Sequence, residues 1–387
     1  MKRRKDAFND KFINVPFFYP SITNKDRKVI SESLKSPLLT DGPNLRKFET
    51  KFSTFTNSKY SIAVSNATSA LFLSLKSLGI RKNDQVIVPD LTFVATASSV
   101  FQTGGLPVLA DVDDDLNISI ESIKQKINSK TKAIIPVHFA GKSCNISEIM
   151  KIAKKNNLLV IEDCAHAIGT YHKGKHVGTF GDTGCFSFYP TKNITTLEGG
   201  MIITKSKKLS KRIMMLKNQG ITKTLNERFS NGRPWEYDII EPGYNFRLDE
   251  IRSALGISQL DQLENFNKKR RNAAKYYTTK LKGIKGISSP DIINKNEHTF
   301  HLYIIKIKKD YKLNRDKLFR KFLKNGIRTS VHYRPLHEFT LLKKETKKNN
   351  SLKNTKKLYE QILSLPLYPN ITKQEQDLVI KVIKDNE

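Results

Sequence analysis

The chain has 387 residues, of which 38% are hydrophobic, enough for a sizeable core and for two domains. Its formal net charge is +31, but no helix-turn-helix or zinc-finger pattern would direct the scattered basic residues at a groove, so we expect no nucleic-acid partner. The basic start at Met1 has no apolar core behind it, no stretch reaches the ~20 apolar residues of a membrane helix, and cysteines are few; we therefore expect a cytoplasmic protein without membrane contact.

Residues 1–35 are predicted to form an N-terminal arm that contains a helix over residues 25–34. A turn over residues 38–43 follows, and then a helix whose phenylalanines Phe48, Phe52 and Phe55 are predicted to be core. We expect this turn to open a large domain over residues 36–265.

Short apolar strands recur through that domain, and each is followed by helical or loop sequence. They are predicted at residues 60–64, 86–89, 107–110, 133–137 and 158–161. This alternation predicts an α/β fold with a doubly wound, mainly parallel sheet. Ligands of such sheets bind beyond the carboxyl ends of the strands, so residues just after each strand are the site candidates.

Small polar residues lie between the strand over 60–64 and the next helix. Free N–H groups at a helix start, together with the helix dipole, bind phosphate well, which makes Thr68 and Ser69 candidates for phosphate binding. Both residues are equally typical of helix caps. After the strand over 86–89, Phe93 could cover the face of a planar ring, or it could simply be core.

Asp163 ends the apolar run Leu158 to Ile161, and Lys192 is the only basic residue between His176 and Lys205. This pair matches the chemistry of pyridoxal phosphate, whose aldehyde forms a Schiff base with a lysine and whose ring nitrogen needs a carboxylate to stay protonated. An aspartate at a strand end can also be a turn or cap residue, and an isolated lysine can point to solvent.

The chain then continues with helical sequence through Leu216, a polar loop over residues 228–235, and Asn245 before another helix, which it could cap. A smaller α/β domain is predicted over residues 266–387, with strands at 302–305 and 327–333 and helices near 314–324 and at the C-terminus. Its histidine pairs lack further ligands, so we expect no metal.

Four segments closely resemble the DegT/DnrJ/StrS family of nucleotide-sugar aminotransferases, and the resemblance covers nearly the whole chain. The segments are Asp163 to Ala167, Gly178 to Asp182, Phe186 to Asn193, and Glu198 to Gly200. The resemblance implies the type I fold of aspartate aminotransferase and a pyridoxal phosphate cofactor.

The resemblance also implies roles for individual residues. Lys192 would hold the cofactor and transfer protons, and Asp163 would bind the ring nitrogen. Phe93 would cover one face of the ring, and His166 would flank it. The phosphate would be held by Thr68, Ser69, Ser187 and, from the neighbouring subunit of a homodimer with a shared active site, Asn245. The substrate candidates are Thr40, Gly42 and His332.

The implied reaction moves an amino group from glutamate to a keto sugar of a nucleoside-diphosphate sugar. The sugar would be a UDP- or dTDP-linked 4-keto-6-deoxyhexose or hexosamine, used for a surface polysaccharide such as the O-antigen of lipopolysaccharide. Related sugar dehydratases carry His in place of the lysine, so Lys192 favours the aminotransferase over a dehydratase. A basic regulatory protein without catalysis is the remaining alternative. The nucleotide, the sugar and the choice between C3 and C4 amination stay open.

Overall fold

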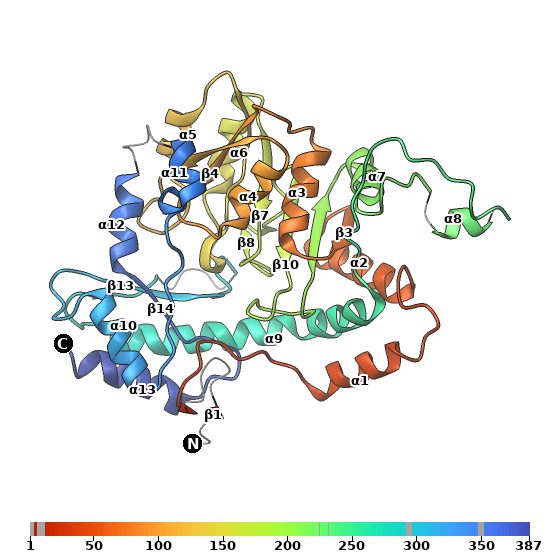
Figure 1. Ribbon diagram of the computed structural model, residues 1–387. Coiled ribbons are helices and arrows are strands. Elements are labelled where there is room, and N and C mark those ends of the chain that lie inside the picture. Colours follow the sequence, from red (N-terminus) through yellow and green to blue (C-terminus); the bar gives the residue numbers. More distant parts are fainter. Residues whose placement is uncertain (1–3, 6–11, 224, 231, 292–295, 347–351) are drawn as a thin grey trace.

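The computed structural model describes residues 4–5, 12–223, 225–230, 232–291, 296–346 and 352–387. Most of the basic start at Met1 lies outside these residues. The centre is a seven-stranded sheet in the order β3-β11-β10-β7-β6-β4-β5 (Figure 1). In that order the strands are Tyr60–Val64, Gly200–Thr204, Thr183–Ser187, Leu159–Asp163, Thr131–Ile134, Gln85–Pro89 and Leu106–Ala110.

Only β11 runs antiparallel to its neighbours, and the other adjacent pairs are parallel. One face packs on helices α3 (Ala67–Ser77), α4 (Ala95–Gln102) and α7 (Lys207–Leu216). The other packs on α2 (Pro43–Thr56), α5 (Ile120–Lys126), α6 (Ile146–Lys155) and α9 (Glu250–Leu281). Burial on both faces explains the continuous apolar strands, and the predicted doubly wound, mainly parallel sheet is confirmed.

Helix α9 connects the two domains that the sequence predicts. Its 32 residues extend over about 48 Å at the usual rise of an α-helix, and Asp249 caps its start. The boundary that we predicted between residues 265 and 266 falls inside this helix, so the three domain limits stay predictions. Helix α1 (Asn24–Ser33) of the arm lies along α9, and Lys25 pairs with Asp261 at 3.0 Å.

A second sheet has the antiparallel order β12 (Ile287–Ser288), β13 (Tyr303–Ile307) and β14 (Ile362–Leu365). It packs with the second half of α9 and with α10 (Arg315–Lys324) and α13 (Lys373–Lys384). The expected strand over residues 327–333 is wrong, because this segment makes only isolated bridges and β14 takes the place beside β13.

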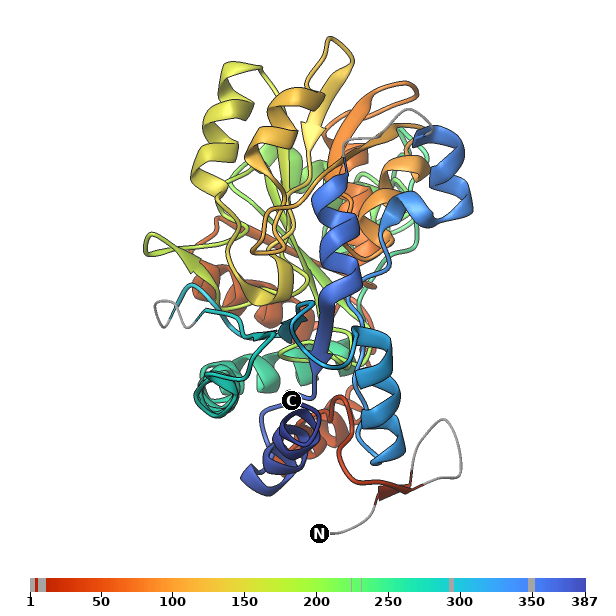
Figure 2. The same cartoon turned by 90° about the vertical axis from the view of Figure 1, so that its left-hand side faces the viewer.

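Helices α11 (Thr340–Thr346) and α12 (Lys353–Gln361) return toward the large sheet, where Leu342 and Leu352 join its core. The remaining elements are short: β1 (Arg4–Lys5), β2 (Phe12–Ile13), β8 (Tyr171–His172), β9 (Lys175–His176), α8 (Leu225–Ser230), η1 (Phe139–Gly141) and η2 (Leu336–Glu338). Strand β1 and helix α13 lie at the same end of the molecule in both views (Figure 2). Across the described ranges, no helix combines the length and apolar character needed to cross a membrane.

Candidate active site

A cavity of about 390 Å³ lies at the carboxyl ends of the central strands, as expected for an open α/β sheet. It brings together six of the residues that the sequence singled out: Thr68, Phe93, Asp163, His166, Ser187 and Lys192. Its other lining residues are Asn66, Ala67, Leu71, Thr92, Ala95, Thr96, Val137, Ala165, Tyr189, Thr191, Glu198 and Tyr333.

Asp163 ends β7 and is almost fully buried. Its carboxylate accepts hydrogen bonds from the Thr96 hydroxyl at 3.0 Å and from the Ala165 N–H at 3.1 Å. Burial has the largest influence and raises the pKa of Asp163, while these hydrogen bonds and the charge of Lys192 partly oppose that rise. The carboxylate oxygens retain lone pairs for a cationic N–H group in the cavity.

Lys192 follows β10 in a turn closed by its own N–H, which donates to the Tyr189 carbonyl at 2.8 Å. Burial lowers the pKa of the Lys192 amine to about 8, and the nearby Asp163 carboxylate limits the decrease. A much larger fraction of this amine is neutral near pH 7 than of an ordinary lysine. Lys192 is therefore suited to attack an aldehyde.

The start of α3 lines the cavity with Asn66, Ala67 and Thr68 and is the candidate anion site. The Asn66 side chain accepts from the Ser69 N–H at 2.8 Å, so Asn66 caps this helix, and neither Thr68 nor Ser69 does. The first helical N–H groups, at Ala67 and Thr68, have no partner within the helix. At Gly200, a Cβ atom would come within 2.6 Å of the Asn66 carbonyl carbon, so this strand closely supports the cap. The arrangement fits a phosphate.

Phe93 and His166 line the same cavity as Asp163 and Lys192. The Phe93 side chain lines the cavity but is 55% exposed, so the alternative that it is core is wrong. His166 Nε2 lies 3.1 Å from the Tyr333 hydroxyl. Burial, followed by the charges of Lys192 and His332, holds the pKa of His166 well below its usual value, so its ring is neutral. A neutral ring and an exposed aromatic face suit a flat cofactor ring.

The family model described as the DegT/DnrJ/EryC1/StrS aminotransferase family matches residues 20–384. The chain belongs to this family. It is 36% identical over 375 residues to the spore coat polysaccharide biosynthesis protein SpsC of Bacillus subtilis, covering 96% of each chain. It is 30% identical to Helicobacter pylori PseC, an aminotransferase involved in the biosynthesis of pseudoaminic acid, with a TM-score of 0.89 and coverage of 96% of this chain and 99% of that one.

A further structural match identifies the cofactor of this aminotransferase. Spr1654 from Streptococcus pneumoniae, solved in a PMP form, is 29% identical with a TM-score of 0.90, covering 96% of this chain and 98% of the other. The same protein has been solved in a PLP form. The chain is thus an aminotransferase with pyridoxal phosphate as its cofactor, and the residues around the cavity fit that group.

Five of the predicted site residues do not line the main cavity of this aminotransferase. Ser69 is buried behind it, where its hydroxyl lies 3.0 Å from the Asn66 side-chain oxygen. Thr40 is exposed and forms an isolated bridge with Asp249. The Gly42 N–H donates to Glu250 at 2.9 Å, and a Cβ atom there would meet that carboxyl group at 2.6 Å. This close packing explains why position 42 is a glycine, and no contact with a substrate is needed to explain it.

Asn245 is exposed, and its side-chain oxygen accepts from Arg247 at 3.0 Å. The alternative that it caps α9 is wrong, because Asp249 does so. His332 lines a smaller pocket beside Lys192. The roles of all five residues stay predictions.

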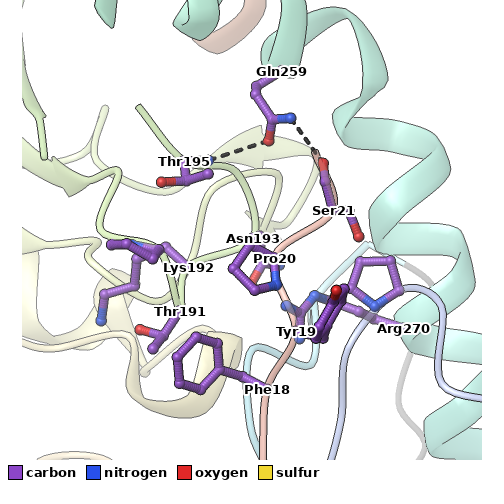
Figure 3. A pocket seen from close by; sticks show the side chains of 12 residues that line it. Phe18, Tyr19, Pro20, Ser21, Thr191, Lys192, Asn193, Thr195, Gln259 and Arg270 are labelled. Atoms are coloured by element: carbon purple, nitrogen blue, oxygen red, sulfur yellow. Dashed lines mark hydrogen bonds between the residues drawn. The ribbon is translucent and has the colours of Figure 1, made fainter. Parts of the chain in front are cut away.

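The N-terminal arm and α9 support the loop that carries Lys192. Phe18 to Ser21 pass between that loop and α9, as Figure 3 shows. Gln259 of α9 connects the two segments, since its amide donates to the Ser21 carbonyl at 3.0 Å and its oxygen accepts from the Thr195 N–H at 3.3 Å. The position of Lys192 in this aminotransferase therefore depends on residues far away in sequence.

Glu162 precedes Asp163 in β7, and its carboxylate is fully buried. Glu162 accepts three backbone N–H groups, from Gly178, Phe180 and Gly181, at 2.7–2.8 Å, and lies 3.1 Å from His138 Nε2. Although burial opposes its charge, the contact with His138 and these hydrogen bonds lower the pKa of Glu162. His138, Glu162 and Cys164 are the one group in the described ranges that could hold a metal ion, but these hydrogen bonds explain Glu162 without one, and the absence of a metal stays a prediction.

Sequence reasoning missed three residues of the site: Asn66, Thr96 and Tyr333. Asn66 was detectable, because an asparagine before a helical segment is typical of a cap. Thr96 lies inside α4 and Tyr333 in an irregular segment, so no periodicity distinguishes them. Their roles depend on contacts across the fold.

Proposed function

We propose that this aminotransferase moves an amino group from glutamate to the keto group of a sugar linked to a nucleoside diphosphate, for a surface polysaccharide. The proposal is supported by the relatives, since SpsC is named for polysaccharide biosynthesis and PseC for the biosynthesis of pseudoaminic acid. The observation that carries it is the placement of Lys192 and Asp163 across one cavity that opens to the surface beside the exposed Phe93 and Tyr189.

The residues divide the chemical work between them. Pyridoxal phosphate, when bound, supplies an aldehyde for the amine and a ring that accepts electrons. Lys192, with its lowered pKa, accepts and returns protons at the carbon beside the transferred nitrogen. Asp163 keeps the ring nitrogen protonated, and Phe93 and His166 hold the ring. We assign the phosphate to the start of α3, with Thr68, Ser69 and Ser187.

Our proposal for the nucleotide-sugar substrate depends on charge and on the relatives, because the sugar-binding candidates lie outside the main cavity. The net charge of +31 attracts a dianionic diphosphate at long range. Because Thr40 and Gly42 lie outside the cavity, their contact with sugar requires a substrate that extends beyond its mouth. We propose a UDP- or dTDP-linked 4-keto-6-deoxyhexose or hexosamine, with use in O-antigen or another cell-surface glycan. A cytoplasmic location and the absence of nucleic-acid and membrane partners stay predictions.

We propose a homodimer in which the partner subunit's Asn245 completes the phosphate site. The segment around α8 stands away from the sheet in Figure 1, and it exposes Phe229, Trp235 and Ile240 at 67%, 70% and 68%. Three large apolar side chains so exposed within one segment are unusual for a surface that faces only water, which supports an interface there. Phe93 and Leu197 are also exposed near the cavity, so a second subunit there would cover its mouth.

The test combines spectroscopy with product analysis. The purified protein is loaded with pyridoxal phosphate, reduced with borohydride and mapped by mass spectrometry, and the modified peptide is expected to contain Lys192. An unreduced sample mixed with glutamate is expected to lose its cofactor band and to release one 2-oxoglutarate per site. A panel of UDP- and dTDP-keto sugars then identifies the acceptor. Absence of 2-oxoglutarate from a correctly loaded protein would refute glutamate as donor.

A further inference from the structure

A second, smaller pocket of about 50 Å³ adjoins the main cavity on the other side of Lys192. It shares Thr191, Lys192 and Tyr333 with the main cavity, so the two spaces meet at the lysine. Two histidines, His301 and His332, supply its polar wall, and the remaining lining is apolar: Phe17, Phe18, Leu302, Leu365 and Leu367. The space exceeds that of one water molecule but is too small for a sugar ring.

The histidines around this pocket have hydrogen-bonding capacity that the protein does not use. Both His301 and His166 are about 95% buried, and the Nδ1 atom of each has no hydrogen-bond partner among the described residues. Their rings lie 4.4 Å apart, which fixes the orientation of His301. His332 Nδ1 is bound to the Ser364 hydroxyl at 2.8 Å, which leaves its other nitrogen for the pocket. Such unpaired buried groups are costly unless a ligand or water satisfies them.

The charges around the pocket favour an anion. Burial has the largest influence and lowers the pKa of His301 far below its usual value, and His166, Lys192, Arg270 and His332 each add to the decrease. Burial and then Lys192 lower the pKa of His332 to about 3. Arg270 is itself buried and donates to the carbonyls of His301 and Leu367 at 3.3 and 3.0 Å, so a positive charge backs the pocket wall.

We infer that this pocket receives the α-carboxylate of the amino donor, with His301 and His332 as the hydrogen-bond donors. The inference rests on the proposed function. The donor nitrogen must replace the Lys192 amine, and an α-carboxylate lies one carbon from that nitrogen, so it must bind beside Lys192. Among the described residues, no arginine lines the main cavity, so the partners left for the carboxylate are the N–H groups of the two histidines, with the charges of Lys192 and the buried Arg270 beside them. A carboxylate stabilises charged imidazole, so donor binding takes up a proton.

The first test measures the reaction of the loaded enzyme with glutamate in His301→Leu, His301→Gln and His332→Leu variants. Loss of one hydrogen bond to a charged group is expected to raise the half-saturating glutamate concentration about 10- to 100-fold, while the rate at saturation changes much less. His301→Gln restores an N–H donor and is expected to recover part of the affinity. The control His172→Leu removes a histidine that contacts Ser147 outside both cavities and is expected to behave as the wild type.

A second measurement covers the case in which a variant fails to fold or to bind cofactor. Glutarate, which has the carboxylates of glutamate but no amine, is titrated into loaded wild-type enzyme by calorimetry in two buffers of different ionisation enthalpy. Proton uptake on binding, favoured below neutral pH, supports the inference. Binding without proton uptake, or unchanged half-saturation in variants that carry cofactor on Lys192, overturns the inference alone. A wild type that forms no oxo acid from any α-amino acid overturns the proposed function as well.

Discussion

At the level of single residues, the site depends on a lysine and an aspartate that burial shifts toward their neutral forms. The pKa of Lys192 falls to about 8 and that of Asp163 rises, in each case because desolvation outweighs the attraction between them. In the proposed arrangement, the protonated ring nitrogen of the cofactor would give Asp163 a cationic partner and so favour its charged form. Burial therefore lowers the pKa of the lysine and raises that of the aspartate, which favours a neutral amine and a carboxyl group that needs a cationic partner to stay charged.

The lowered pKa of Lys192 predicts how the apoprotein takes up pyridoxal phosphate. Only the neutral amine reacts, so the rate is expected to rise about tenfold per pH unit below pH 8 and to level off above it. Stopped-flow absorbance from pH 6 to 10 measures this rate. A rate that still rises above pH 10 would indicate an ordinary lysine, and Lys192→Ala gives the background signal.

Replacing Asp163 separates cofactor binding from cofactor activation. Asp163→Asn is expected to keep the fold and the covalent link to Lys192 but to slow the reaction with glutamate about 100- to 1,000-fold, because an amide cannot stabilise the protonated ring. Thr96→Val removes one hydrogen bond to Asp163 and is expected to have a smaller effect in the same direction. Equal rates for Asp163→Asn and the wild type in single-turnover assays would exclude this role.

At the level of elements, the proposed phosphate site lies where β11 packs against the start of α3. Asn66 caps the helix, and the absence of a side chain at Gly200 lets the strand approach the cap. Glu250 performs a related task at the start of α2, where its carboxylate accepts the N–H groups of Gly42, Asn44 and Leu45. Each helix start is thus held by a polar side chain that the local sequence pattern only partly reveals.

The cap at α3 can be tested by paired substitutions. Asn66→Ala is expected to lower the free energy of unfolding by about 1 kcal/mol and to weaken cofactor binding, whereas Asn66→Ser keeps a capping oxygen and most of both properties. Chemical denaturation and cofactor titration measure the two effects. If both variants bind cofactor as tightly as the wild type, the cap does not contribute to the phosphate site.

At the level of the whole molecule, the segment around α8 exposes apolar side chains, and Asn245 is exposed outside the main cavity. The central cavity collects residues from α3, α4, β7, β10 and the segment near Tyr333, and α9 with the N-terminal arm supports Lys192 from behind. A second subunit over the cavity mouth would complete this enclosure.

The proposed dimer, with Asn245 contributed by the partner subunit, predicts that two inactive variants complement each other. Trp235→Glu combined with Ile240→Asp is expected to yield monomers in light scattering and to weaken cofactor binding, while Leu341→Asp on α11, also at an exposed position, leaves the dimer intact. Mixing Lys192→Ala with Asn245→Ala subunits is expected to restore activity in part, because one site of the mixed dimer has both residues. A wild-type protein that is monomeric at assay concentration contradicts the proposal.

The local sequence was sufficient to predict the mainly parallel sheet and the positions of Asp163 and Lys192 beyond its strands, because buried strands and their ends are encoded by short apolar runs. The catalytic role of Lys192 stays a prediction. It predicted a strand at residues 327–333 wrongly, since the choice between that segment and β14 is made by packing against β13. Only the tertiary structure decided that Thr96 contacts Asp163 and that His301 and His332 meet beside Lys192, because these contacts join residues distant in sequence. It also decided the low pKa of Lys192, because desolvation depends on everything packed around the amine.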